Sequence, residues 1–407
     1  MTGNTEGPSA DGQGKSQPFD FLKPPEVFGR AEVEGQLAIA PMFSGMTIRD
    51  CRLDGLQFRA AAFGEVVLER VDLSGTEMTA VAFSECRFVD CRFGNAKLLS
   101  LAFSDCSFTG CDFRDCLLEV FTFVSCRFEG CDFRGTRFKV DALTGSSFRG
   151  CRFERSDQWC TVWQDCELQD QSWRGATLYC TILAKGDSTG LDLGDAELER
   201  CIVQQTDIRP LKLGGTVLNT VAFQDCILDE MDFAGRELRQ LQFLDCSMKG
   251  IDLSGATMPN CGFAKADLTG GNLSGAMAAG CNFAGAVLAG AAMQGIKAQQ
   301  ASFAAADLTG AQLKGGSLHT AFLEGATAKG ADLGSVDFRY ARMANADLTD
   351  SDLRKADFRW ADHHRLQAEG ARWDDARTKG VRPTNREREQ AETHLPAAAF
   401  KTAAKAV

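Results

Sequence analysis

Cysteine and histidine are the residues of this 407-residue chain whose spacing would reveal chemistry most directly, and the chain has 17 cysteines but only four histidines. Several cysteines follow one another at five-residue steps, as in Cys86–Cys91 and in the series Cys106, Cys111 and Cys116. No CxxC pair occurs to form a zinc knuckle. The regular step indicates a repeat instead of a metal cluster, and we expect no metal site and no cofactor.

Residues for acid–base or phosphate chemistry are equally sparse. His363 and His364 have only Asp362 beside them, while His319 and His394 are isolated in the sequence. The many glycines include no GxxxxGK[ST] phosphate-binding motif. The sequence therefore predicts that the protein is not an enzyme.

A five-residue period organises the chain. From Leu53 to Phe358 every fifth residue is a large apolar side chain, without one insertion. The exceptions are Gln158, Ser188, Ala278, Ala298 and Ala328. A five-residue step would rotate around an α-helix and would alternate sides on a straight strand, so neither element explains the period. A chain that runs extended for about three residues and then turns a corner does explain it, and that chain is a solenoid.

The residues two positions before each large apolar residue must share the interior, and most of them are small. Fifteen of the 17 cysteines occupy such positions, all except Cys160 and Cys180. A thiol there acts as a small buried apolar group. We expect these cysteines to be buried and, in a reducing cytosol, to remain free thiols. Inward charges at Asp141 and Arg236 need partners or must swing outward.

A longer period gives the number of walls. Similar hexapeptides begin at Val81, Leu101, Val221 and Leu241, and all their spacings are multiples of twenty. Four five-residue walls therefore form one coil. Residues 43–360 correspond to about sixteen coils and a rod of roughly 75 Å, at the usual spacing between neighbouring strands. The predicted fold class is an all-β solenoid.

Three segments carry a family resemblance: Ala266–Gly270, Ala306–Gly310 and Ala346–Asp350 resemble the A(D/N)LxG unit of pentapeptide-repeat proteins. The resemblance implies a right-handed quadrilateral β-helix with short capping segments. The family includes DNA-mimicking topoisomerase inhibitors, secreted bacterial effectors and accessory proteins of secretion systems. It thus implies three classes of function without choosing between them.

Composition along the chain predicts four segments. We expect a disordered N-terminus at 1–17, an N-terminal cap at 18–42, the β-helix at 43–373 and a partly helical C-terminal tail at 374–407. Polar residues at inward or central positions, namely Gln158, Gln171 and Ser188, predict a bulge or widened corner in irregular coils at 156–190.

Charge narrows the possible partners. The chain has 44 Lys+Arg and 55 Asp+Glu, a net charge of −11, which argues against direct nucleic-acid binding. The absence of an 18-residue apolar run and of a signal-peptide pattern predicts a cytoplasmic bacterial protein without membrane insertion. One corner carries acidic side chains at multiples of twenty residues, which form a possible acidic face: Glu65, Glu85, Asp105, Asp165, Asp225 and Asp245. The charge per length of the rod is well below that of B-DNA, so full-length DNA mimicry is disfavoured.

Another edge carries apolar side chains at outward positions, and we predict that it is a protein-interaction surface. It comprises Leu99, Val120, Val140, Trp159, Val162, Tyr179, Ile182 and Ile202. Three alternatives stay open: a bulge that turns them inward, a cover formed by the N-terminal segment, and chance. The leading hypothesis is a non-enzymatic rigid scaffold that binds a protein partner or a second copy of itself. The alternatives are a DNA mimic that modulates a type II topoisomerase, and an accessory or effector protein of a bacterial secretion system.

Overall fold

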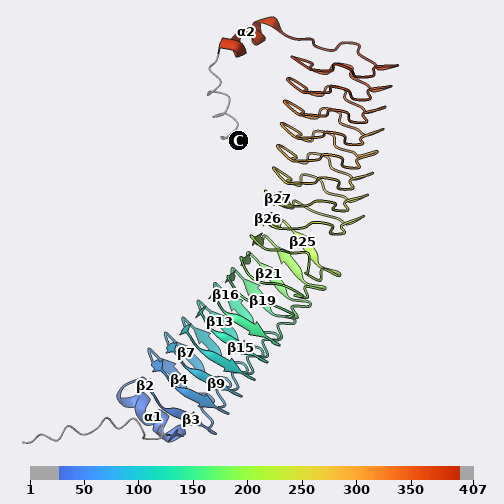
Figure 1. Ribbon diagram of the computed structural model, residues 1–407. Helices are drawn as coiled ribbons and strands as arrows, with labels where there is room; N and C mark the ends of the chain where they lie inside the picture. Colours follow the sequence, from blue (N-terminus) through green and yellow to red (C-terminus); the bar gives the residue numbers. More distant parts are fainter. Residues whose placement is uncertain (1–26, 395–407) are drawn as a thin grey trace, which may run out of the picture.

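The computed structural model describes residues 27–394 and shows an elongated parallel β-solenoid with a short helix at each end (Figure 1). The predicted disordered segment 1–17 and most of the predicted cap before residue 27 lie outside the described residues. The predicted all-β solenoid is confirmed. Each coil has four walls, which we number in chain order.

Three walls are parallel sheets of very short strands. Wall 1 contains β2 (Met42–Ser44), β5 (Ala62–Gly64), β8 (Ala82–Ser84), β11 (Ala102–Ser104), β14 (Thr122–Val124), β17 (Ala142–Thr144), β20 (Val162–Gln164), β22 (Ile182–Ala184), β24 (Ile202–Gln204), β26 (Ala222–Gln224) and β27 (Gln242–Leu244). Wall 2 contains β1 (Val27–Phe28), β3 (Thr47–Arg49), β6 (Val67–Glu69), β9 (Arg87–Val89), β12 (Ser107–Thr109), β15 (Arg127–Glu129) and β18 (Ser147–Arg149). Wall 4 contains β4 (Gln57–Arg59), β7 (Glu77–Thr79), β10 (Lys97–Leu99), β13 (Leu117–Glu119), β16 (Arg137–Lys139), β19 (Asp157–Trp159), β21 (Thr177–Tyr179), β23 (Glu197–Glu199) and β25 (Val217–Asn219). Wall 3 is held by single-residue bridges such as Arg52↔Asp72 and Asp132↔Arg152.

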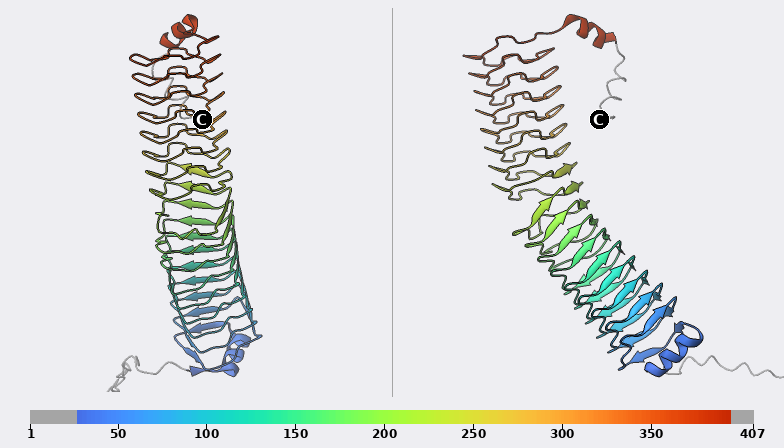
Figure 2. Two further views of the ribbon diagram at one scale, coloured as in Figure 1. Left: turned by 90° about the vertical axis from the view of Figure 1, so that its right-hand side faces the viewer. Right: turned by 180° about the vertical axis from the view of Figure 1, so that it is seen from behind.

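The register between neighbouring coils is twenty residues throughout, as in Phe43↔Phe63 of wall 1. Strands extend over about eleven turns, up to β27, and the later turns are held by isolated bridges. These bridges continue to Asp362↔Arg382, so the ladder runs past the boundary at 373 expected from the sequence. Backbone pairing continues there because Trp373 still packs on Phe358, with ring centroids 5.1 Å apart. The rod changes direction where strands give way to bridges, around β25 to β27 (Figure 2).

The core is built from stacked columns of identical side chains. Phe88 lies 4.5 Å from Phe108 between ring centroids, and Phe108 lies 4.5 Å from Phe128, with nearly parallel rings. Fourteen of the fifteen cysteines predicted to face inward are buried, and all are free thiols. Cys51, in the first full coil, is half-buried, as are the two outward cysteines Cys160 and Cys180.

The twenty-residue register continues through coils 156–190 in walls 4 and 1, as in Gln158↔Leu178 and Trp163↔Leu183. In wall 2 the bridges Glu167↔Asp187 and Asp207↔Ile227 flank a gap, because no bridge joins residues 187 and 207. The bulge or widened corner expected in these coils stays a prediction. The interior accommodates the polar side chains with hydrogen bonds. Gln158 Oε1 accepts a hydrogen bond from Trp163 Nε1 at 2.9 Å, and Gln171 Nε2 donates to the Phe148 carbonyl at 2.8 Å.

The two inward charges behave differently. Asp141 stays in the core, with 2% of its surface exposed, and its Oδ1 accepts a hydrogen bond from the Phe121 backbone at 2.9 Å. Its Oδ2 has no hydrogen-bond partner among residues 27–394. Arg236 is half-buried and reaches the Leu213 carbonyl with Nη2 at 3.0 Å. The free-energy cost of removing a charge from water is therefore expected mainly at Asp141 and less at Arg236.

Short helices lie against both ends of the solenoid. At the first end, α1 (Arg30–Ile39) buries Val33, and β1 pairs with β3 in wall 2. At the other end, α2 (Arg386–His394) follows the last bridge. His364 Nδ1 accepts a hydrogen bond from the Asn385 backbone at 3.1 Å, and Glu392 lies 3.2 Å from His364 Nε2. Edge groups of the terminal coils are thus partly covered, which opposes stacking of one rod on another.

Candidate interaction surfaces

The predicted apolar edge lies at the corner between walls 4 and 1, and we call it the apolar ridge. Seven of its predicted members lie within successive coils: Val120, Val140, Trp159, Val162, Tyr179, Ile182 and Ile202. Trp159 is paired in register with Tyr179 in wall 4, and Val162, Ile182 and Ile202 form one column in wall 1. The eighth, Leu99, lies at the end of the ridge, and Glu119 and Lys139 separate it from Trp159 in their column.

The ridge presents large apolar groups to solvent. Val120, Val140 and Trp159 have exposed fractions of 55%, 62% and 52%. The Trp159 and Tyr179 rings contact each other edge to face with centroids 5.5 Å apart, and Arg200 donates a hydrogen bond to the Tyr179 hydroxyl at 3.0 Å. These contacts hold the two aromatic side chains in place before any partner arrives.

The backbone conformation at the corner of the ridge is unfavourable for the residues that occupy it. Val120 and Val140 have φ of 55° and 58°, in the left-handed region that β-branched residues rarely adopt. Glycine occupies many equivalent corners of the rod, for example Gly110 and Gly130. A valine at such a corner, with its side chain in solvent, has no explanation in backbone geometry or in core packing.

Two of the alternatives for the ridge can be compared with the described residues. The side chains do not turn inward, since the register of walls 4 and 1 is unbroken there. The described part of the N-terminal segment pairs with wall 2 through Val27↔Thr47, away from the ridge. The remainder of that segment, 1–26, lies outside the described residues.

The six predicted acidic residues lie at the corner between walls 1 and 2, each with φ between 52° and 54°: Glu65, Glu85, Asp105, Asp165, Asp225 and Asp245. Their column is interrupted by Ser125 and Gly145 and then by Lys185 and Gln205. The acidic corner is therefore three short groups and not one continuous row.

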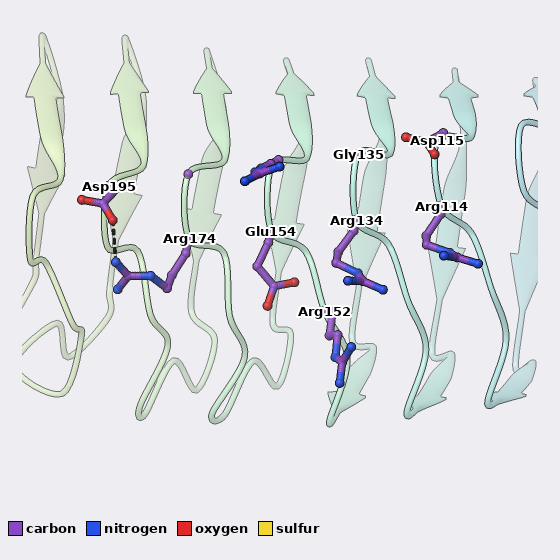
Figure 3. Close-up of a pocket in the computed structure, with 10 residues that line it drawn as sticks. Arg114, Asp115, Arg134, Gly135, Arg152, Glu154, Arg174 and Asp195 are labelled. Carbon is purple, nitrogen blue, oxygen red and sulfur yellow. Dashed lines mark hydrogen bonds and ion pairs between the residues drawn. The ribbon is translucent and has the colours of Figure 1, made fainter.

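A third surface was missed by the sequence analysis. At the corner between walls 3 and 4, a hollow of about 820 Å³ is lined by Arg114, Asp115, Arg134, Gly135, Arg152, Glu154, Arg155, Arg174, Gly175 and Asp195 (Figure 3). We call it the arginine groove. Arg114, Arg134, Glu154 and Arg174 occupy one column on successive coils, as Figure 3 shows. That twenty-residue spacing of arginines was the signal that could have revealed the groove.

Most arginines of the groove are held by neighbouring carboxylates. Arg114 pairs with Asp112 at 2.6 Å, Arg134 with Asp132 at 2.6 Å, and Arg174 with Asp195 at 2.5 Å. The hydrogen bond from Arg114 holds the pKa of Asp112 below its ordinary value. Arg152 and Arg155 differ, because their guanidinium groups form no ion pair or hydrogen bond with any residue in 27–394.

Groups for acid–base chemistry do not gather at any of these surfaces. Burial lowers the pKa of His363 to about 4, and its neighbour His364 is engaged with α2. Within residues 27–394 no group of three potential metal ligands is close enough to hold an ion, and no helix has the length and apolar character to cross a membrane.

Family models match two long parts of the chain. Residues 43–123 match the model described as "Pentapeptide repeat region", and overlapping segments from 237 to 362 match "Pentapeptide repeats (8 copies)". No curated protein matches the chain. Among solved structures, full-length QnrB1, a plasmid-mediated fluoroquinolone resistance protein, is 19% identical, with 53% of this chain and 92% of that chain covered and a TM-score of 0.29. HetL, involved in heterocyst differentiation regulation in the cyanobacterium Nostoc sp. strain PCC 7120, is 20% identical, with coverages of 54% and 88% and a TM-score of 0.20.

Proposed function

This chain belongs to the pentapeptide-repeat family, and on that premise we propose that it is a non-enzymatic rigid scaffold that binds a protein partner through the apolar ridge. The observation that carries the proposal is the exposure of Val120, Val140 and Trp159 on adjacent coils. Soluble proteins rarely expose a contiguous apolar strip without a use for it. The strained backbone of Val120 and Val140 supports the same conclusion, because glycine would fit those corners at lower cost.

The architecture suits such a scaffold. Each coil contacts its two neighbours in fixed register, so an outer side chain is positioned by the coil spacing and not by a flexible loop. The partner would meet a ridge that is already ordered, and binding would require little loss of conformational freedom. Trp159 and Tyr179 are the side chains expected to dominate the interaction, since large amphipathic aromatics are typical hot spots.

The size of the ridge is adequate for specific binding. If the seven contiguous side chains and the groups that cover them remove roughly 400 Å² of apolar surface from water, the gross gain is about 10 kcal/mol at ~25 cal/mol per Å². Association opposes this gain with a cost of several kcal/mol. The remainder corresponds to a useful affinity.

The experiment is affinity capture from the native host with the wild type and with Trp159→Asp/Val162→Lys. The matched control is Trp360→Asp/Met277→Lys, which changes an exposed tryptophan and an exposed aliphatic residue far from the ridge. Loss of the captured protein with the ridge variant alone supports the proposal, and equal capture by all three proteins contradicts it. Sedimentation of the purified variants tests a homodimer in the same way.

A second candidate function rests on the acidic corner. Glu65, Glu85 and Asp105 stack on three successive coils, which favours binding to a basic protein surface such as the DNA-binding face of a type II topoisomerase. A supercoiling assay tests it: inhibition or protection by the wild type, lost in Glu65→Gln/Glu85→Gln/Asp105→Asn, would place this function first. We propose a cytoplasmic location for either function. Fractionation of the native bacterial host tests this location, and recovery of the chain in the medium would favour a secreted effector instead.

A further inference from the structure

We propose that the arginine groove binds a carboxylate-rich segment of the protein partner, so that the partner presents acidic side chains beside the apolar group that covers the ridge. This inference rests on the proposed function, since it names the chemistry of the same partner. It is carried by the guanidinium groups of Arg152 and Arg155, which have no partner among residues 27–394, and by the position of the groove next to the ridge.

The first step is the charge of the groove. Arg114, Arg134 and Arg174 are paired with carboxylates of their own chain, which fixes their guanidinium groups in place. No residue of the described part of the chain takes up the guanidinium groups of Arg152 and Arg155, and a guanidinium group matches the two oxygens of a carboxylate. Both belong to one coil at the centre of the groove, whose ends are marked by Asp115 and Asp195.

The second step is the location. The groove and the apolar ridge lie at the two edges of wall 4, and they occupy the same coils. Between them, β16 presents Arg137 and Lys139, and the neighbouring strands β13 and β19 present Glu119 and Asp157. Because a three-residue strand is only about 10 Å long, a partner that covers wall 4 contacts both edges at once. An acidic segment in the groove and an apolar group on the ridge can therefore belong to one partner.

The third step distinguishes a protein ligand from a nucleic acid. The chain has a net charge of −11, and Asp115 and Asp195 close both ends of the groove. They lie four coils apart, which is roughly 19 Å at the usual strand spacing. A long phosphate backbone would have to continue past these carboxylates, whereas a short extended peptide of about six residues fits between them.

The probe for the test is a fluorescein-labelled six-residue peptide, Glu-Glu-Leu-Glu-Leu-Glu, titrated with the full chain and followed by fluorescence anisotropy. The control peptide has Gln in place of every Glu. We expect the Glu peptide to bind at low salt, the Gln peptide to bind at least tenfold more weakly, and 0.5 M salt to remove the difference. Binding of both peptides alike, or no binding of the Glu peptide at 1 mM protein, would overturn the inference.

Variants locate the binding. Arg152→Glu/Arg155→Glu should weaken binding of the Glu peptide at least tenfold. The control Arg87→Glu/Arg127→Glu, two exposed arginines of wall 2 outside any ion pair with residues 27–394, should change it less than twofold. Glu154→Gln removes a negative charge from the groove and should strengthen binding. If the groove variant and the control variant lose affinity for the Glu peptide equally, the peptide responds only to the overall charge of the chain. The assignment of the binding site to the arginine groove would then be wrong.

Two further measurements keep the outcome clear. If Arg152→Glu/Arg155→Glu unfolds, the neutral pair Arg152→Gln/Arg155→Gln replaces it, with the same expected direction. A fluorescent DNA duplex of twelve base pairs is titrated in parallel, and tighter binding of DNA than of the Glu peptide would contradict a carboxylate ligand. In one outcome, the Glu peptide shows no specific binding while Trp159→Asp/Val162→Lys still abolishes capture of the partner. That combination would contradict the assignment of the groove and would still support the scaffold proposal.

Discussion

Replacing Asp141 by Asn should remove a loss of core stability that develops as the pH rises toward neutrality. Burial raises the pKa of the Asp141 carboxyl to about 8 from an ordinary value of 3.8, and the hydrogen bond from the Phe121 backbone only partly offsets this effect. Between these two pH values the folded chain holds a proton at Asp141 that the unfolded chain releases. The contribution of Asp141 to the free energy of unfolding is therefore full below pH 3.8 and is lost as the pH rises to about 8.

The magnitude follows from the width of that window. One pKa unit corresponds to about 1.4 kcal/mol, so Asp141 lowers the free energy of unfolding by about 4 kcal/mol between pH 4 and pH 7. Asn has nearly the same shape and does not titrate, and its Oδ1 can still accept the hydrogen bond from Phe121. The difference in stability between Asp141→Asn and the wild type should therefore grow by about 4 kcal/mol in favour of Asn over the same pH interval.

Guanidinium denaturation at pH 4.5, 6 and 7.5, followed by the fluorescence of the buried Trp163 and Trp173, measures this difference. The control is Asp170→Asn, which removes a carboxyl group at an exposed corner of the next coil. We expect its stability to stay parallel to that of the wild type at all three pH values. A constant difference between Asp141→Asn and the wild type across the pH range would refute the reasoning, because it would mean that Asp141 is ionised in the folded chain.

Three further predictions concern other parts of the rod. A thiol reagent should modify Cys160 and Cys180 in the native protein well before the fourteen buried thiols, and a uniform labelling rate would contradict their outward positions. Burial lowers the pKa of His363 to about 4 from 6.5, so the contribution of His363 to stability is present above pH 6.5 and is lost as the pH falls to 4. Denaturation of His363→Leu at pH 4.5 and at pH 7 should therefore show a smaller loss of stability in acid than the wild type shows. Gly186→Ala should lower stability by about 1–3 kcal/mol in guanidinium denaturation, because the added Cβ would lie 2.5 Å from the Cys166 carbonyl oxygen, and an unchanged midpoint would show that the coils can separate there.

The sequence predicted the coils because their geometry is set by a period that a single chain displays many times. A residue such as Phe108 is buried for the same reason as Phe88 and Phe128, and each repeat strengthens the inference. The irregular coils were predicted because a polar residue at an inward position was interpreted as a conflict with the fold. Gln158 instead finds its partner in Trp163, in wall 1 of the next coil, which a pattern of residue types does not reveal.

The surfaces were less predictable than the core. The outward columns of the apolar ridge could be read from the sequence, because each column is one position of the period. The arginine groove depends on side chains from three adjacent columns, and on which of them pair with a neighbouring carboxylate. Arg134 and Arg155 carry the same charge in the sequence, but only the structure shows that the first is paired with Asp132 and the second is unpaired with any residue in 27–394.

Photo-crosslinking from the ridge in the native host tests the central claim most directly. A benzophenone amino acid replaces Tyr179 in the middle of the ridge, and Tyr340, a half-exposed tyrosine in the same corner column as Val140 but ten coils further along, serves as the control position. The account predicts one crosslinked protein species from position 179, abolished by Val162→Lys and absent from position 340. The same crosslinks from both positions, or crosslinks at 179 that persist with Val162→Lys, would contradict the proposal that the apolar ridge is the binding surface.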